Sequence, residues 1–232
     1  MTLHKCVLFD LDGTLVDSLA DLANSMNRVL TRQGLPPHPV QAYRYFVGNG
    51  ITTLVERALP MGAQQQELVQ DCVQKMRQEY AVHWADTTSP YPGIAELLDT
   101  LATQEIQMAI LSNKPDELTQ EIVRTLLPKW NFAAVAGARE TIPKKPDPAG
   151  ALRIANLLHR EPADFLYLGD TNTDMQTARA AKMFAVGALW GFRTAEELKE
   201  NGAQALISGP MELCPWLLHH TPKPKTHHGK LR

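Results

Sequence analysis

Short apolar runs alternate with longer helical patterns along most of the chain. The runs are rich in Val, Ile, Leu and Phe, which is typical of strands buried on both faces of a parallel sheet. The alternation predicts an α/β fold: a doubly wound, mainly parallel, Rossmann-like sheet with helices on both faces. The expected strands are residues 7–10, 106–112, 132–136, 165–170, 184–189 and 205–207.

The interval between the first two strands departs from this alternation. Residues 18–86 contain no convincing strand, only helical stretches separated by turns. Ser18 and Asp21 resemble a capping box that opens the first helix, and three prolines within residues 34–39 end it. Further helices are expected at residues 40–46, 51–59 and 64–84, and residues 89–93 are expected to form a rigid return link.

These helices predict a helical insert of about 70 residues after the first strand. We expect a core domain of residues 1–16 and 88–218, an all-helical cap domain of residues 17–87 and a basic tail of residues 219–232. The cap leaves and rejoins the core beside the end of the first strand, which is where a lid would be placed. The tail is expected to be disordered and solvated; metal or anion binding by its histidines and basic side chains is the alternative.

Composition and charge exclude several classes of protein. The chain has 232 residues, 44% of them hydrophobic, and a formal net charge of −2, so its electrostatics do not favour a nucleic-acid partner. No apolar stretch has the length of a membrane span and the N-terminus lacks a signal-peptide profile, so no membrane partner is expected. Cys6, Cys72 and Cys214 are isolated, which argues against a disulfide framework or zinc cluster and suits a cytoplasmic location.

Asp10 and Asp12 are the first candidates for chemistry. They end the first apolar run, one residue apart, and are followed by Gly13 and Thr14. Residues i and i+2 of an extended chain point the same way, so both carboxylates can enter the crevice where α/β sheets bind ligands. Two anions this close repel each other unless a cation lies between them or one of them binds a proton. An acidic turn at the end of the strand is the alternative.

Three later strand ends carry further polar groups. Ser112 and Asn113 precede a helix start and offer a hydroxyl and backbone N–H groups to phosphate oxygens, or else form a plain helix cap. Lys145 lies in a proline-rich loop that can aim its ammonium at clustered negative charge; an inert exposed lysine is the alternative. Asp170 and Asp174 add oxygen ligands of the kind that Mg²⁺ prefers, although Asp174 could instead cap its helix.

In this order, the four sites resemble the motifs of the haloacid dehalogenase superfamily of phosphotransferases. The all-helical insert is similar to the first type of cap in that family, and the resemblance spans residues 5–218. The matching segments are residues 10–14 for the first motif, Ser112-Asn113 for the second, Lys145 for the third, and Gly169-Asp170 with Asp174 for the fourth.

The resemblance implies a Mg²⁺-dependent phosphatase that acts through an aspartyl-phosphate. Asp10 would be the nucleophile, and Asp12, where the dehalogenases carry a different residue, would donate and accept the proton. One departure is Lys182, which stands at a turn where relatives commonly have glycine. The implied phosphate ligands are Thr14, Ser112, Asn113 and Lys145, and the implied metal ligands are Asp10, Asp12 through its carbonyl, Asp170 and Asp174.

The cap is expected to choose the substrate. Residues 46–59 resemble the cap segment of the phosphoglycolate phosphatase subgroup, which implies 2-phosphoglycolate as the substrate. Two glycines there free the backbone to approach a small anion at a helix start, and an arginine could bind its carboxylate; a plain tight turn is the alternative. The expected cap residues are Gly48, Asn49, Gly50 and either Arg44 or Arg57.

Other substrates and one other class of protein stay open from sequence. Similar caps occur in pyrophosphatases and in phosphatases of other small metabolites, and a β-phosphoglucomutase would reuse the aspartyl-phosphate to phosphorylate a sugar. A non-catalytic binding domain is disfavoured by the intact acidic motifs. The expected partner is a small phosphorylated metabolite, bound by a monomer or a homodimer.

Overall fold

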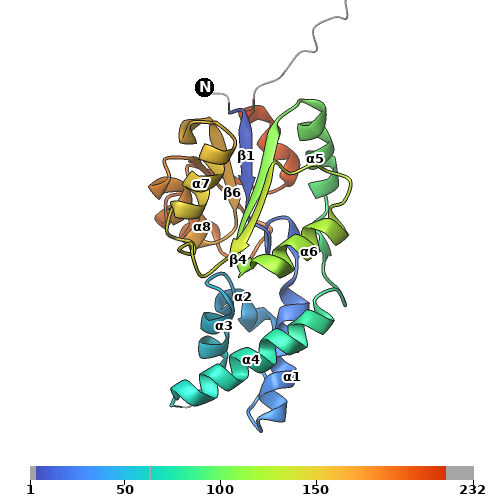
Figure 1. Ribbon diagram of the computed structural model, residues 1–232, viewed down its shortest axis with the longest axis vertical. Helices are drawn as coiled ribbons and strands as arrows, with labels where there is room; N and C mark the ends of the chain where they lie inside the picture. Colours follow the sequence, from blue (N-terminus) through green and yellow to red (C-terminus); the bar gives the residue numbers. More distant parts are fainter. Residues whose placement is uncertain (1–3, 63, 218–232) are drawn as a thin grey trace, which may run out of the picture.

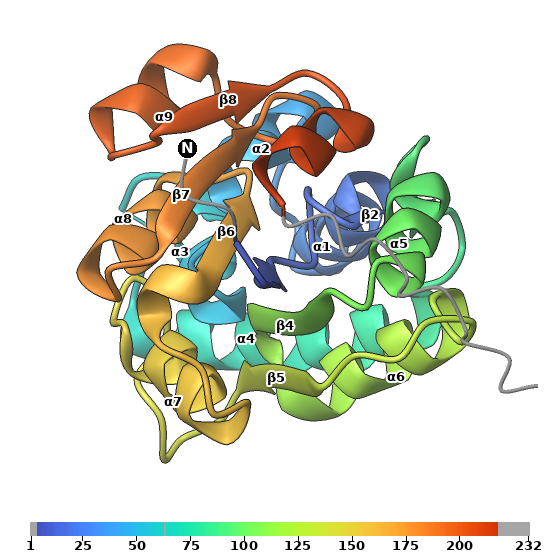
Figure 2. The same cartoon turned by 90° about the horizontal axis from the view of Figure 1, so that it is seen from above.

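The computed structural model describes residues 4–62 and 64–217. Figure 1 shows a sheet with its helices above a smaller group of helices, and Figure 2 shows the sheet from above with helices on both sides. All neighbouring strands of the sheet are parallel, so the predicted α/β fold with its helical insert is confirmed. The strand order is β5 (Ala134–Ala138), β4 (Gln107–Pro115), β1 (Cys6–Phe9), β6 (Phe165–Gly169), β7 (Phe184–Ala188) and β8 (Ala205–Ile207).

The central strands are buried on both faces because helices cover each side of the sheet (Figure 2). Val7 and Phe9 of β1 lie in one apolar cluster, whereas Cys6 and Leu8 lie in the other. This division follows from the two-residue period of an extended chain. The first face is covered by α5 (Ile94–Thr103), α6 (Asp116–Leu126) and the 3₁₀ helix Pro210–Trp216, and the second by α7 (Ala149–Leu157), α8 (Asn172–Ala180) and α9 (Ala195–Glu200).

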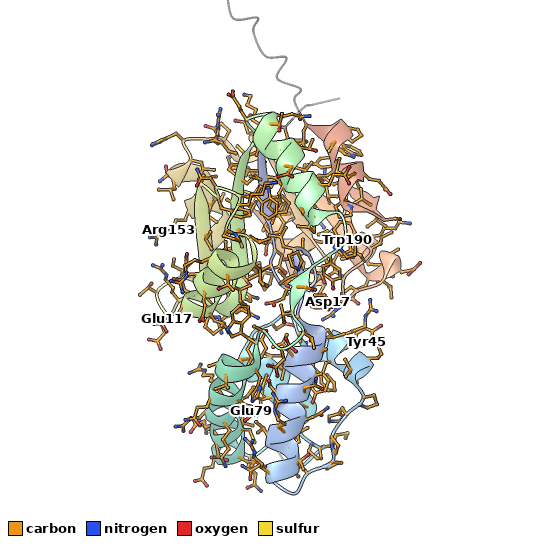
Figure 3. The ribbon with its side chains drawn as sticks, turned by 90° about the vertical axis from the view of Figure 1, so that its right-hand side faces the viewer. Asp17, Tyr45, Glu79, Glu117, Arg153 and Trp190 are labelled. Atoms are coloured by element: carbon orange, nitrogen blue, oxygen red, sulfur yellow. The ribbon has the colours of Figure 1, made fainter. Side chains whose placement is uncertain are left out.

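The helical insert forms the lower part of the molecule in Figure 1. Its longest helices, α1 (Leu19–Arg32) and α4 (Gln66–His83), lie side by side and bury Met26 and Met76 in a common core. Glu79 of α4, labelled in Figure 3, binds Arg32 of α1 at 2.5 Å. The 3₁₀ helix Val40–Ala42, α2 (Tyr43–Phe46) and α3 (Ile51–Ala58) complete the insert, so every helical stretch expected there is present.

A short antiparallel ladder joins the two connections of the insert. β2 (Val16–Asp17) pairs with β3 (Ser89–Pro90), and Figure 3 shows Asp17 at the junction of the two parts. The sequence did not predict this ladder, because two residues are too few to show a hydrophobic period. The ladder holds both connections together, while the domain boundaries at residues 17 and 87 stay predictions.

The predicted capping box of Ser18 and Asp21 is wrong. The Ser18 hydroxyl donates to Asp12 Oδ1 at 2.6 Å and makes no hydrogen bond to α1. The Asp21 carboxylate accepts four hydrogen bonds of 2.6–2.9 Å from the N–H groups and hydroxyls of Thr87 and Thr88. Burial raises the pKa of Asp21, but these hydrogen bonds outweigh it and hold the pKa below its usual value. Asp21 therefore fastens α1 to the returning chain.

Lys182 adopts the left-handed conformation that the sequence predicted, with a φ of 59°. Its N–H and that of Met183 close the end of α8 by donating to Arg179 O and Ala178 O. A side chain at such a position costs some local stability relative to glycine.

None of the described helices is long and apolar enough to cross a membrane. The predicted basic tail, residues 219–232, lies outside the described residues.

We predict that Asp21→Ala lowers the free energy of unfolding by about 2–4 kcal/mol, because four donors lose one buried acceptor. The pKa of Asp21 is lower in the folded protein than in the unfolded chain. Asp21 therefore contributes to the free energy of unfolding at pH values above its unfolded pKa, and this contribution is lost as the pH falls through its folded pKa. Urea unfolding at about pH 7 and about pH 3 should therefore show a smaller difference from wild type at the lower pH.

The control is Asp86→Ala, which removes an exposed carboxylate beside His83. It should change the free energy of unfolding by less than about 0.5 kcal/mol. A similar loss in both variants at neutral pH would contradict the role given to Asp21.

Candidate active site

The polar groups singled out in the sequence meet at the carboxyl edge of the sheet. Asp10 follows β1, Ser112 lies near the end of β4, and Asp170 follows β6. β1 pairs with both β4 and β6, so these three positions are neighbours. The chain turns to opposite sides of β1 in its two halves, which makes this edge the switch point where open α/β sheets bind ligands.

Three buried carboxylates form the centre of the site. Asp10, Asp170 and Asp174 each bring one oxygen into a group whose members all lie within 4.8 Å of one another. Lys145 Nζ lies 2.8 Å from Asp10 Oδ1 and 2.7 Å from Asp174 Oδ1. All four residues are 6% exposed or less, so one ammonium faces three carboxylates away from bulk water.

This imbalance of charge changes the protonation of the cluster. Burial and the charge of Asp174 raise the pKa of Asp10, and Lys145 offsets them only in part. Burial and Asp174 also raise the pKa of Asp170, to about 7. Burial lowers the pKa of Lys145, but Asp10 and Asp174 outweigh it, so that pKa lies well above its usual value. A further cation beside Asp10 and Asp170 would therefore favour the ionised forms of these two carboxylates.

Asp170 is held by two loops of the core. Thr14 donates its hydroxyl to Asp170 Oδ1 at 2.8 Å, and the Phe192 N–H donates to Oδ2 at 2.8 Å. Gly13 has a φ of 85°, and a Cβ at Gly13 would lie 2.3 Å from Asp170 Oδ2, so glycine is required for both the turn and the close approach. The sequence interpretation gave Thr14 to the phosphate. In the structure its hydroxyl orients Asp170, and a phosphate contact stays a prediction.

Asp174 takes part in two sets of contacts. It is the third residue of α8 and forms a capping box with Thr171, whose N–H and hydroxyl donate to Oδ2 at 3.0 and 2.6 Å. Its other oxygen, Oδ1, accepts from Lys145. Asp174 therefore caps α8 and belongs to the acidic cluster at the same time. Its role as a metal ligand stays a prediction.

Asn113 joins the Lys145 loop to the cap. Its Nδ2 donates to Lys145 O and to Gly48 O, both at 3.0 Å, and its Oδ1 accepts from the Lys145 N–H at 2.9 Å. These bonds hold the loop against β4 and so aim the Lys145 ammonium at the cluster. The Ser112 hydroxyl accepts from the Lys114 N–H at 3.2 Å and lines the cavity described below. Phosphate contacts by Ser112 and Asn113 stay predictions.

Asp12 lies beside the cluster with different partners. Its Oδ1 accepts hydrogen bonds from Ser18 Oγ at 2.6 Å and from Lys114 Nζ at 2.8 Å. Lys114 Nζ also donates to the hydroxyl of Tyr80, on α4 of the cap, at 2.8 Å. Burial lowers the pKa of Lys114, but Asp12 and Tyr80 outweigh it and raise that pKa. The sequence interpretation missed both residues: Lys114 directly follows a motif, whereas no sequence signal places Tyr80 against it.

A cavity of about 540 Å³ lies between the acidic cluster and the cap. Asp10, Asp12 and Lys145 line it from the core. Arg77 of α4 and Lys144, both exposed, add positive charge to its lining, as do Lys114 and Arg139. Three glutamates of the core add negative charge: Glu117, Glu121 and Glu140. The sequence interpretation gave neither Arg77 nor Lys144 a role in the site, although Lys144 directly precedes the motif lysine. An anionic ligand in the cavity could therefore contact positively charged side chains other than Lys145.

Two arginines join the cap to the core beside this cavity. Arg44 of α2 donates to the carbonyls of Gly191 and Phe192 in the core. In return, Arg193 of the core donates to the carbonyls of Arg44 and Val47 in the cap. Because the Phe192 N–H also binds Asp170, the loop that holds the acidic cluster is the loop that contacts the cap.

The predicted cap residues differ in their positions. Gly48 and Gly50 line the cavity, but Arg44 and Asn49 are not among the described residues that do so. Arg57 donates to the carbonyl of Tyr45, 2.9 Å away, within the cap. Substrate contacts by these residues stay predictions.

Comparison with known proteins identifies the family to which the chain belongs. The family profile described as haloacid dehalogenase-like hydrolase matches residues 7–188. The chain belongs to this family. It is 33% identical over 218 residues to a phosphoglycolate phosphatase of Pseudomonas putida, covering 92% of this chain and 80% of that protein. It is 31% identical over 216 residues to a phosphoglycolate phosphatase of Aquifex aeolicus, covering 93% and 98%. A solved structure, a predicted phosphoglycolate phosphatase from Haemophilus somnus, gives a TM-score of 0.85 at 25% identity, covering 93% and 98%.

This haloacid dehalogenase-like hydrolase is a phosphatase, that is, a phosphoric monoester hydrolase. The alternative of a non-catalytic binding domain is therefore set aside. Phosphatases of the family generally use a divalent metal, and the acidic cluster fits one. Its carboxylate oxygens are close together, are of the type that hard divalent cations prefer, and carry more negative charge than Lys145 can balance.

We predict that Asp170→Asn stabilises the metal-free protein by about 1–3 kcal/mol at pH 8. The folded pKa of Asp170 is raised to about 7, so ionising this carboxyl opposes folding as pH rises from its unfolded pKa towards that value. The amide can satisfy both existing contacts, accepting from the Phe192 N–H and donating to the Thr14 hydroxyl. Thermal unfolding with EDTA at about pH 5 and about pH 8 measures the effect, which should be larger at the higher pH.

With excess Mg²⁺, wild type should become more stable than Asp170→Asn. The ion would stabilise the folded state of wild type by binding to it, and it would stabilise the variant less because it would bind the variant more weakly. A lower melting temperature for Asp170→Asn than for wild type in EDTA at about pH 8 would show that charge crowding does not govern this cluster.

Proposed function

We propose that the chain is a Mg²⁺-dependent hydrolase of small phosphate monoesters, that its preferred substrate is 2-phosphoglycolate, and that the reaction passes through an aspartyl-phosphate on Asp10. The proposal is carried by the cluster of Asp10, Lys145, Asp170 and Asp174 at a cavity shared with the cap. The substrate is favoured by the names of the relatives from Pseudomonas putida and Aquifex aeolicus.

Mg²⁺ would be held by oxygens of Asp10 and Asp170 and by the backbone carbonyl of Asp12. Both oxygens of Asp174 already accept hydrogen bonds from Lys145 and Thr171, which favours its contact with the ion through a water molecule. The bound ion supplies positive charge that lets the carboxylates ionise together and offsets the charge of the phosphate.

In the first half of the reaction, a carboxylate oxygen of Asp10 forms a bond to phosphorus while the bond to the leaving oxygen breaks. The electron pair of the broken bond stays on the leaving oxygen, which takes a proton from Asp12 and departs as an alcohol. Asp10 suits the nucleophilic role because its Oδ1 is fixed by Lys145 at 2.8 Å and cannot rotate freely.

In the second half, water attacks phosphorus and the bond to Asp10 breaks, which restores the carboxylate and releases inorganic phosphate. Asp12 takes the proton of the attacking water and is thereby ready for the next cycle. Lys145 and Ser112, which both line the cavity, would hold the oxygens of the transferring group, over which the negative charge spreads in the transition state.

Cations that line the cavity besides Lys145 could bind the second acidic group of a small phosphorylated substrate. Phosphate would bind near Lys145, and the carboxylate of 2-phosphoglycolate would extend towards the cap. There it meets Arg77 and Lys144. Arg44 is engaged with the carbonyls of Gly191 and Phe192, so we assign the carboxylate contact to Arg77 and Lys144 instead.

Asp10→Asn should reduce turnover to background, because an amide cannot form the aspartyl-phosphate. The variant should melt at or above the temperature of the metal-free wild type, since it removes one of the crowded carboxylates. EDTA should abolish the phosphatase activity of wild type, and added Mg²⁺ should restore that activity. Asp71→Asn, which alters a cap carboxylate paired with Lys75, is the control; appreciable activity in Asp10→Asn would overturn the assignment of the nucleophile.

A substrate panel tests the choice of phosphate ester. We expect kcat/KM for 2-phosphoglycolate to exceed that for pyrophosphate and glucose 1-phosphate by about tenfold or more. Similar values across the panel would reject a dedicated phosphoglycolate enzyme. Preference for pyrophosphate, or transfer of phosphate to a sugar instead of water, would favour the pyrophosphatase or the β-phosphoglucomutase alternative.

Cap and loop variants refine this test. Arg77→Met and Lys144→Met should each raise KM for 2-phosphoglycolate by about tenfold, because each removes a charge-assisted contact with its carboxylate. Lys75→Met is the control for Arg77→Met, since Lys75 lies on the same helix and pairs with Asp71. Equal KM values in the three variants would refute the carboxylate contact.

A further inference from the structure

Lys114 connects the proposed proton carrier of the core to the cap. Its Nζ lies 2.8 Å from Asp12 Oδ1 and 2.8 Å from the hydroxyl oxygen of Tyr80. Lys114 is 7% exposed and Tyr80 is 2% exposed. A buried ammonium is costly unless its hydrogen-bond partners are in place. Lys114 therefore depends on one partner from the core and one from the cap.

Asp12 receives its side-chain hydrogen bonds on a single oxygen. Ser18 Oγ and Lys114 Nζ both donate to Oδ1. Two donors on one oxygen fix the rotation of the carboxyl group. Since Asp12 lines the cavity, and since no hydrogen bond to Oδ2 is formed within the described part of the chain, Oδ2 is the oxygen available for proton transfer.

Both donors to Asp12 Oδ1 depend on the position of the cap. Tyr80 lies on α4, so movement of α4 away from the core would remove the Tyr80 hydroxyl from Lys114. Ser18 directly precedes α1, at the first connection between core and cap. The orientation of Asp12 is therefore linked to the cap at two points, one through α1 and one through α4.

We infer that Lys114 and Tyr80 are positioning residues: with the cap in place, they hold Asp12 so that Oδ2 delivers its proton to the leaving oxygen. The inference rests on the proposed role of Asp12 and adds a requirement for the cap. As the phosphorus–oxygen bond breaks, its electron pair stays on the leaving oxygen, and the proton from Oδ2 neutralises that oxygen. Without the Tyr80 contact, Lys114 and Asp12 are free to turn, and a strongly basic leaving group departs more slowly.

The test compares two kinds of leaving group that differ in their need for a proton. The weakly basic p-nitrophenolate leaves p-nitrophenyl phosphate without assistance, whereas an alkoxide must be protonated. The alkyl substrates are 2-phosphoglycolate and glucose 1-phosphate; the second has no carboxylate that Lys114, which also lines the cavity, could bind directly. kcat/KM for each reports the steps up to formation of the aspartyl-phosphate.

Tyr80→Phe removes the hydroxyl and keeps the ring. We expect it to lower kcat/KM for both alkyl phosphates by about tenfold and that for p-nitrophenyl phosphate by less than about threefold. Lys114→Met should show the same selectivity with a larger loss for the alkyl phosphates, about 100-fold. A residue that only stabilised the cap would lower the values for both kinds of substrate by the same factor.

The matched control is Tyr43→Phe. Tyr43 is a buried tyrosine of the cap whose hydroxyl donates to Asn27 Oδ1 at 2.7 Å, away from Lys114. It should show no selectivity between the two kinds of substrate. Thermal unfolding checks that each variant folds. If Lys114→Met does not fold, the selectivity of the nearly isosteric Tyr80→Phe variant alone tests the inference.

Asp12→Asn separates this inference from the function on which it rests. If Asp12→Asn lowers kcat/KM equally for both kinds of substrate, the proposed role of Asp12 in protonating the leaving group fails. If Asp12→Asn is selective but Tyr80→Phe is not, the role of Asp12 stands and the inference about the cap is overturned. Selective losses in Asp12→Asn, Lys114→Met and Tyr80→Phe together support it.

Discussion

The burial of three carboxylates around one ammonium is the constraint on which this site depends. Asp10, Asp170 and Asp174 repel one another, and Lys145 neutralises only part of their charge. Such a cluster persists only where the surrounding structure holds each member in place. The ends of β1 and β6, the capping box of α8 and the stiff loop around Lys145 provide that support. The resulting deficit of positive charge makes the site receptive to a divalent cation, and the charge of that cation would in turn attract a phosphate.

The same edge of the sheet separates two aspartates that are one residue apart. Asp10 faces Lys145 and the acidic cluster, whereas Asp12 faces Ser18 and Lys114. A carboxylate fixed against a buried ammonium suits attack on phosphorus, because its orientation is set before the substrate arrives. A carboxyl outside the cluster, held at one oxygen and lining the cavity, suits proton transfer. The difference in their partners therefore accounts for the two different roles that we propose for them.

The sequence predicted those parts of the structure that depend on local pattern. The six core strands and the helices of the insert follow from apolar periodicity, and Asp10, Lys145, Asp170 and Asp174 follow from motifs at strand ends. The prediction from sequence was wrong where a side chain binds a distant partner instead of a local one. Ser18 donates to Asp12, and Asp21 binds Thr87 and Thr88, so the expected capping box does not form. Lys114 and Tyr80 were missed for the same reason, since they are 34 residues apart in the sequence and meet only where the cap meets the core.

The contacts between cap and core begin at residues that directly follow functional positions. Asn113 and Lys114 follow Ser112 and reach Gly48 and Tyr80 of the cap, and Arg193 follows Phe192, whose N–H holds Asp170. A displacement of the cap would therefore change the hydrogen bonds of the Lys145 loop and the surroundings of Asp12 and Asp170. If Asp12 and Asp170 have the roles proposed above, these contacts would let the cap help to set the geometry of the core site, although the cap supplies none of the motif residues.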